Sequence, residues 1–105
     1  MARKITTDTV NAFMSAKPFS RANSSVYVEL DIVTHEQLEV FMSLHGHDIA
    51  RRKIGSNDIE VTNADYFTNT TKERLNGLPG VSVCQRKGVW FLNGEEWDGT
   101  WKVVA

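Results

Sequence analysis

The stretch from Gly80 to Val104 constrains the fold more than any other part of the chain. It contains all three tryptophans and three dipeptides typical of tight turns, which are Lys87-Gly88, Asn93-Gly94 and Asp98-Gly99. The last two are pairs that type I′ hairpin turns favour, because both central residues of such a turn need positive φ. The runs between the turns are rich in β-branched and aromatic residues. The stretch therefore predicts a meander of four short strands, with aromatic side chains fixing the strand register.

The rest of the chain fits one ordinary globular unit. Its 105 residues are enough to bury one hydrophobic core, and no repeat or linker divides them, so we expect a single domain over residues 1–105. The hydrophobic share of 41% and the charged share of 24% are those of soluble proteins. No apolar run approaches the length that crosses a bilayer, and the N-terminus lacks the apolar segment of a signal peptide. We expect a cytoplasmic protein without membrane contacts.

A first helix is predicted over Ile5–Lys17. Its apolar residues have helical spacing, with Thr6 or Thr7 as the N-cap, and it ends before Pro18 because the residue preceding a proline is disfavoured in the α region. These apolar residues are Val10, Phe13 and Met14. The following segment, Phe19–Ser24, is polar and is predicted to be a loop.

A second, short helix is predicted at about residues 70–77. Thr70 and Glu73 have the spacing of a capping box, and Gly77 predicts a stop in the left-handed conformation. Leu75 is expected to point inward. A helix this short is not stable alone in water, so it must pack against a sheet.

The middle of the chain predicts further strands. Val26–Ile32 alternates apolar and polar residues, which places one face on a core and the other in water. Residues 36–44 also alternate, and we favour a strand there over a helix capped at Thr34. Ile59–Thr62 is another strand candidate. The fold class is therefore α+β, with an antiparallel sheet of short meander strands, an N-terminal helix and the short capped helix.

Several motifs occur together in the middle and C-terminal parts of the chain. They are LHGHDIA at 44–50, NTTKERL at 69–75, LPGV at 78–81, GVWFLNG at 88–94 and WDG at 97–99. On these motifs the chain resembles a family of small proteins encoded by bacteriophages and prophages. The resemblance implies a phage origin, and hence the cytoplasm of the host cell, together with a compact α+β domain. It implies no reaction.

Metal and thiol chemistry have weak signals in this sequence. His45, His47 and Asp48 form a group of potential metal ligands, but His35 is the only further histidine, so we favour a solvated turn and expect no metal site. The single cysteine, Cys84, cannot form an intramolecular disulfide and lies in a predicted strand, which favours a buried or half-buried thiol.

Two groups of residues are candidate binding surfaces. An acidic turn beside tryptophans would suit a basic surface on a partner protein; it comprises Glu95, Glu96, Trp97, Asp98 and Trp101. A basic stripe beside aromatic residues would suit a single-stranded nucleic acid; it comprises Arg51, Arg52, Lys53, Arg86 and Lys87, extended by Lys72 and Arg74. The net charge of −1 gives no general attraction to nucleic acid, so we favour the first surface.

The functional prediction combines the resemblance with the absence of motifs. The sequence has no catalytic or cofactor motif of high specificity, so we expect no enzyme activity and no cofactor. We predict a phage accessory protein that acts as a non-catalytic binding module and binds or inhibits a host protein or defence complex. Two alternatives stay open. One is a nucleic-acid-binding protein of phage DNA or RNA metabolism, and the other is a self-assembling structural component that forms homo-oligomers.

Overall fold

The computed structural model describes residues 4–104 of the chain. Two helices and nine strands lie within these residues. The helices are α1 (Lys4–Met14) and α2 (Asn69–Asn76). The strands are β1 (Phe19–Arg21), β2 (Ser24–Leu30), β3 (Gln37–Leu44), β4 (His47–Lys53), β5 (Ile59–Val61), β6 (Val83–Arg86), β7 (Val89–Leu92), β8 (Glu95–Glu96) and β9 (Lys102–Val104). The predicted α+β class, with an N-terminal helix and a short second helix, is confirmed.

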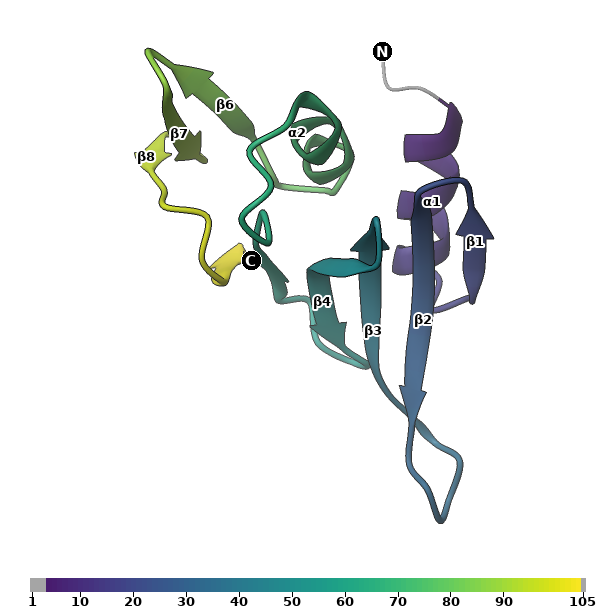
Figure 1. Ribbon diagram of the computed structural model, residues 1–105. Coiled ribbons are helices and arrows are strands. Elements are labelled where there is room, and N and C mark those ends of the chain that lie inside the picture. Colours follow the sequence, from purple (N-terminus) through teal and green to yellow (C-terminus); the bar gives the residue numbers. More distant parts are fainter. Residues whose placement is uncertain (1–3, 105) are drawn as a thin grey trace.

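The strands form two antiparallel sheets. The larger sheet has six strands in the order β1-β2-β3-β4-β5-β9, and the smaller has three in the order β6-β7-β8. α1 packs against β1, β2 and β3 on one face of the larger sheet, and Figure 1 shows this helix behind the strands. α2 contacts α1, β4 and β6, so it links the larger sheet to the smaller one.

Alternation along the strands decides which side chains enter the core. Val26, Met42, Ala50 and Val61 lie in register across β2 to β5, and all are buried. Phe13 of α1 is fully buried in the same core. Because successive side chains of a strand point to opposite faces, the neighbouring residues form a second row on the face away from α1.

Several expectations for the N-terminal half need correction. Phe19–Ser24 is not a loop, because β1 pairs with β2 from Phe19↔Val26 to Arg21↔Ser24. Thr6 is not an N-cap, because α1 already begins at Lys4, and the Thr6 side chain is instead fully buried inside the fold. Met14 lies on the exposed side of α1, whereas Val10 and Phe13 are buried as expected. β2 ends at Leu30, so Ile32 does not lie on a core-facing strand as expected but is exposed. Residues 37–44 form a strand, as favoured.

The ends of α2 also differ from the prediction. The N-cap is Thr68, whose side-chain oxygen accepts a hydrogen bond from the Thr71 backbone N–H, so Thr70 does not start a capping box. Gly77 has right-handed φ and ψ of −75° and −18°, and therefore does not provide the expected left-handed stop. A side chain at Gly77 would collide with Thr6 and Val10 of α1, so packing rather than φ requires glycine there. Leu75 is fully buried, as expected.

The predicted four-stranded meander contains only three strands. Lys87-Gly88 and Asn93-Gly94 have positive φ at both residues and join β6, β7 and β8. At Asp98-Gly99 only the glycine has positive φ. The Gly99 carbonyl accepts hydrogen bonds from the Thr62 hydroxyl and the Asn63 backbone N–H, which draws the chain towards the larger sheet. β9 consequently pairs with β5 rather than with the smaller sheet.

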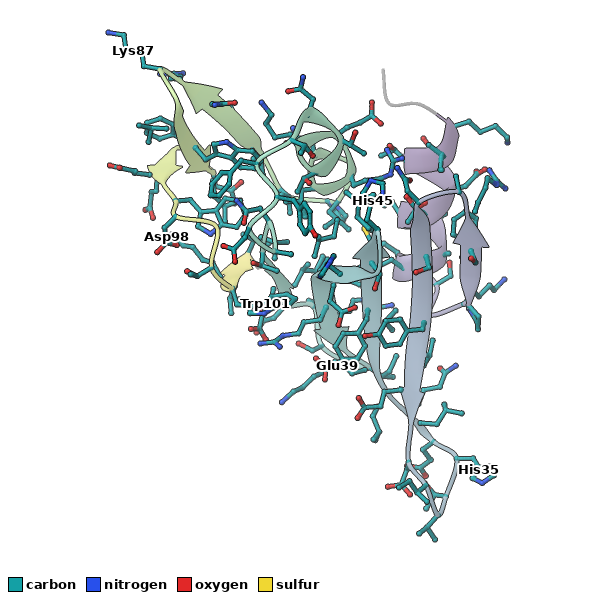
Figure 2. All side chains as sticks on the ribbon, viewed as in Figure 1. His35, Glu39, His45, Lys87, Asp98 and Trp101 are labelled. Carbon is teal, nitrogen blue, oxygen red and sulfur yellow. The ribbon has the colours of Figure 1, made fainter. Side chains whose placement is uncertain are left out.

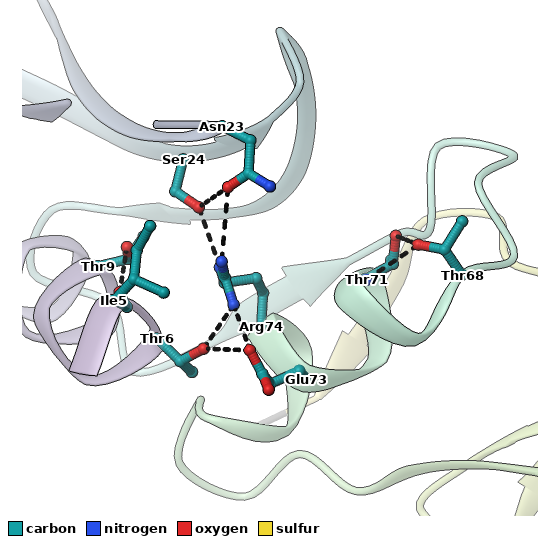
Figure 3. A network of polar contacts seen from close by, with 9 residues as sticks. All are labelled: Ile5, Thr6, Thr9, Asn23, Ser24, Thr68, Thr71, Glu73 and Arg74. Carbon is teal, nitrogen blue, oxygen red and sulfur yellow. Dashed lines mark hydrogen bonds and ion pairs between the residues drawn. The ribbon is translucent and has the colours of Figure 1, made fainter. Parts of the chain in front are cut away.

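A buried arginine connects both helices to β2. Arg74 of α2 is only 1% exposed. Its guanidinium donates hydrogen bonds to the hydroxyls of Thr6 (2.6 Å) and Ser24 (2.9 Å) and forms an ion pair with Glu73. Thr6 in turn donates to the Glu73 carboxylate at 3.0 Å, which closes the network in Figure 3. Arg74 therefore belongs to the core and not to a basic surface stripe.

Candidate functional site

The face of the larger sheet opposite α1, here called the open face, carries a continuous row of side chains. Five residues lie in register across β2, β3, β4, β5 and β9, namely Tyr27, Phe41, Arg51, Glu60 and Val103. Tyr27 is 43% exposed and Val103 is 53% exposed. The three residues between them are half-buried. The row therefore offers aromatic and charged groups to an incoming molecule.

One end of the row is an aromatic pair. The rings of Tyr27 and Phe41 stack with centroids 4.8 Å apart and planes 12° apart. The Tyr27 hydroxyl donates a hydrogen bond to Asp48 at 2.7 Å, and Ser43 donates to the other oxygen of that carboxylate at 2.6 Å. These contacts hold the tyrosine ring in place on the surface.

The environment of Tyr27 keeps its hydroxyl protonated. Partial burial raises the pKa of Tyr27 above its ordinary value of 10.0, and the hydrogen bond to Asp48 and the charges of Asp48, Glu29 and Glu39 raise it further. The side chain is therefore a neutral hydrogen-bond donor at physiological pH, and the surrounding field is negative.

The other end of the row brings together one residue from each of the two predicted binding surfaces, Arg51 from the basic stripe and Trp101 from the acidic turn. Arg51 forms an ion pair with Glu60 at 3.0 Å. Its guanidinium also lies over the Trp101 ring, 4.1 Å from the centroid. Trp101 is 37% exposed and lies beside the larger sheet (Figure 2). The open face thus gains an arginine and tryptophan pair, which neither predicted group contains by itself.

The predicted acidic turn borders an open hollow next to Trp101. The hollow has a volume of about 490 Å³ and is lined by Glu96, Trp97, Asp98, Thr100, Trp101 and Lys102. Trp97 is only 5% exposed, and its indole N–H donates to the Thr100 carbonyl at 2.8 Å, so this tryptophan supports the turn rather than offering a free surface. Of the two predicted tryptophans, only Trp101 is accessible.

The carboxylates of the turn are engaged locally. Glu95 pairs with Lys102 at 2.9 Å, and this contact lowers the pKa of Glu95. Asp98 accepts hydrogen bonds from the hydroxyl and the backbone N–H of Thr100, and these lower the pKa of Asp98. Glu96 is exposed on the edge strand β8. Both of the shifted carboxyls are therefore charged at neutral pH.

The basic residues proposed for nucleic acid do not gather on one surface. Arg51 and Arg52 are neighbours on β4 and face opposite sides of the sheet, and Arg52 donates to the backbone carbonyls of Phe13 and Met14 at 3.1 and 2.7 Å, at the end of α1. Lys53 is exposed at the end of β4. Arg86 and Lys87 lie at the β6–β7 turn, where Figure 2 places Lys87 at one end of the molecule.

The remaining candidate groups are separated or already bonded. His45 lies in a turn with φ of 53°, while the His47 ring is 3.0 Å from the Tyr66 hydroxyl and Asp48 is bonded to Tyr27 and Ser43. Within residues 4–104 no group of three or more histidine, cysteine, aspartate or glutamate side chains is placed to hold a metal ion. Cys84 is exposed on the edge strand β6, so the expectation of a buried or half-buried thiol is wrong.

Sequence reasoning missed the aromatic pair and Glu60 as parts of a surface. The sequence indicates one of these residues, because the alternation of Val26–Ile32 assigns Tyr27 to the solvent side. The register that aligns Tyr27 with Phe41 and Arg51 comes only from pairing between distant strands.

Comparison with known protein families gives a match over nearly the whole chain. The model of the family described as Kyanoviridae Gp96 protein matches residues 2–103. No curated protein and no solved structure is significantly similar to the chain. Over residues 4–104, neither helix has the length and apolar character needed to cross a membrane.

Proposed function

The chain belongs to the Kyanoviridae Gp96 protein family, a phage-encoded family, and we propose that it acts as a non-catalytic module that binds a protein of the host cell. Binding takes place on the open face, and inhibition of the host protein or defence complex follows where that face covers a functional surface of the partner. The site of action is the host cytoplasm.

The observation that carries this proposal is the composition of the exposed row. Tyrosine, tryptophan and arginine are the residues most enriched among the dominant contacts of protein interfaces. The open face holds one of each, with Tyr27 stacked on Phe41 and Arg51 stacked on Trp101. These contacts restrict the side chains before binding, so less side-chain conformational entropy is lost when a partner binds.

The electrostatics support binding rather than catalysis. A general acid or base works best with a pKa near the operating pH. The pKa of Tyr27 is raised further from neutrality, and the pKa values of Glu95 and Asp98 are lowered further from it. These groups therefore keep one protonation state around neutral pH, which suits fixed hydrogen bonds and charges across an interface.

Affinity capture from infected host cells tests the proposal. We expect the tagged full chain to recover a stoichiometric host protein, and the variants Tyr27→Ala and Trp101→Ala to bind that purified protein at least about 10-fold more weakly. Met14→Ala is the matched control, because Met14 is similarly exposed (41%) on α1, at the opposite face of the sheet. Thermal unfolding of each variant separates lost contacts from lost folding.

The other outcomes contradict the proposal in distinct ways. Recovery of nucleic acid that nuclease removes would favour the nucleic-acid alternative. Recovery of further copies of the chain alone would favour a self-assembling component. Equal weakening by Met14→Ala would place the binding surface elsewhere.

A further inference from the structure

The β2–β3 hairpin extends beyond the rest of the larger sheet. β2 and β3 pair as far as Leu30↔Gln37, whereas the pairing of β4 with β3 stops at Glu39↔Lys53. Figure 1 shows this hairpin projecting from the body of the molecule, and Figure 2 places His35 near its end. Residues 29–39 are here called the finger.

The end of the finger exposes adjacent apolar side chains. Ile32 is 92% exposed and Val33 is 87% exposed, the two highest values among the exposed large hydrophobic residues between positions 4 and 104. Leu30 and Leu38, nearer the sheet, are 49% and 42% exposed. Single exposed apolar residues are common, but four within one projecting hairpin form an apolar patch.

Hydrogen bonds hold the end of the finger in one conformation. The Asp31 carboxylate accepts from the backbone N–H groups of Val33 and Thr34 at 2.8 and 2.9 Å. The Asp31 carbonyl accepts from the His35 N–H, and the Asp31 N–H donates to the Glu36 carbonyl. Ile32 and Val33 are β-branched and therefore also stiff at χ1. The apolar patch is thus pre-organised, which lowers the entropy cost of inserting it into a partner.

The finger also carries four carboxylates. Glu29 lies directly opposite Glu39 in the β2–β3 register, an arrangement of like charges that destabilises a sheet, while Lys53 of β4 lies opposite Glu39 on its other side. Within residues 4–104, neither carboxylate forms an ion pair. Asp31 and Glu36 add two more acids, and the finger contains no lysine or arginine, although the whole chain has a net charge of only −1. Positive groups on a partner would relieve this repulsion.

We infer that the finger inserts Ile32 and Val33 into an apolar pocket of the host protein, between lysine or arginine side chains on the rim of that pocket. This inference rests on the proposed function and specifies the chemistry of the partner. The apolar end supplies contact area, and the acidic sides select a basic rim and speed the encounter. An anionic lipid surface is disfavoured as the target, because the same carboxylates would repel it.

Two sets of variants separate the apolar from the acidic contribution. We expect Ile32→Ser with Val33→Ser to weaken binding to the captured host protein by at least about 30-fold. We expect Glu29→Gln with Glu39→Gln to slow association at low salt by about 3-fold or more. The matched controls are Met14→Ser for the apolar change and Asp65→Asn for the acidic one, and neither should alter binding.

Photo-crosslinking identifies what the end of the finger touches. The full chain carrying p-benzoylphenylalanine in place of Val33 is expressed in infected cells and irradiated, with the same group in place of Met14 as the control. The inference predicts an adduct between position 33 and a host peptide of apolar residues flanked by lysine or arginine. An adduct with a second copy of the chain, an adduct with lipid, or no adduct at position 33 overturns it.

The failure of this inference differs from the failure of the proposed function. If the unmodified chain captures a host protein and the Ile32→Ser, Val33→Ser variant binds it equally well, only the finger is excluded. If the unmodified chain captures no host protein, the proposed function fails as well.

Discussion

At the scale of single residues, Arg74 makes contacts that no other side chain could replace. Its planar guanidinium reaches Ser24 on β2, Thr6 on α1 and Glu73 on its own helix at the same time. Three elements far apart in the sequence thereby share one buried charge. Removing the charge would leave the hydroxyls of Thr6 and Ser24 without the donor from which they accept, and would remove the cation that pairs with Glu73.

We predict that Arg74→Met lowers the free energy of unfolding by about 3 kcal/mol, since buried polar groups that lose their partners cost about 1–3 kcal/mol each. Arg21→Met is the matched control, because Arg21 also pairs with a carboxylate, Asp8, but its side chain is 50% exposed. That surface pair should contribute less than about 1 kcal/mol. Urea unfolding of both variants measures the difference, and equal losses would contradict a structural role for Arg74.

Gly99 is required by both conformation and space. Its φ of 91° is unfavourable for other residues, and an added Cβ would collide with the side chain of Asn63. Its carbonyl receives the hydrogen bonds that direct the chain to β9. A substitution at Gly99 is therefore expected to displace Trp101, two residues later.

We predict that Gly99→Ala destabilises the fold by about 3 kcal/mol, of which strain at positive φ accounts for about 1 kcal/mol and overpacking for the rest. Gly94→Ala isolates the first part, because Gly94 has φ of 86° but has no atom within 4 Å of an added Cβ. Chemical unfolding compares the two, and tryptophan fluorescence reports any displacement of Trp101. Similar losses for both variants would exclude the collision with Asn63.

At the scale of elements, the finger depends on the charge of Asp31. Hydrogen bonds from the backbone N–H groups of Thr34 and Val33 lower the pKa of Asp31 below its ordinary value of 3.8. A lowered pKa in the folded state means that the ionised carboxylate stabilises the turn. That stabilisation is complete above pH 3.8 and is lost as the pH falls through the lower folded value.

We predict that hydrogen exchange of the Val33 and Thr34 amides stays slow above pH 3.8, once the intrinsic pH dependence is removed, and accelerates at a midpoint below that value. NMR spectroscopy between about pH 5 and about pH 2 follows both amides. Asp31→Ala should show rapid exchange of both amides throughout the range. A midpoint above 3.8 would contradict the stabilising role of the carboxylate.

At the scale of the whole molecule, two connections hold the sheets together. α2 contacts both α1 and β6, and the chain leaves the smaller sheet after β8 and joins the larger one as β9. Trp90 on β7 and Trp97 directly after β8 are buried, with ring centroids 6.3 Å apart. β2, β3 and β4 form the centre of the larger sheet. Unfolding of either sheet would expose core residues of the other.

We predict that the chain unfolds as a single domain in one cooperative transition, as expected for its length. Tryptophan fluorescence reports mainly on the smaller sheet and far-ultraviolet circular dichroism mainly on the larger one, so their urea midpoints should coincide. Val104→Asp, which places a charge at a position only 5% exposed on β9, should lower both midpoints together. Different midpoints would mean that the two sheets unfold independently, and would contradict a single domain.

The sequence by itself determined the local elements and their class. Alternation identified β2 and β3, helical spacing identified α1, and Asn93-Gly94 identified a hairpin turn, because these patterns depend on neighbours within a few residues. It also placed Tyr27 on the solvent side, and the structure agrees. The sequence named Trp101 as a candidate binding residue, and its role in binding stays a prediction.

Only the tertiary structure decided how these elements combine. Asp98-Gly99 has the sequence of a hairpin turn, but hydrogen bonds from Thr62 and Asn63 send the next strand to β5. From the sequence Arg74 is predicted to be a surface cation, yet Thr6 and Ser24 provide buried partners for it. The same pairing brings Trp101 to Arg51, 50 positions apart in the chain. Such contacts between distant segments leave no local pattern, and they are what build the open face.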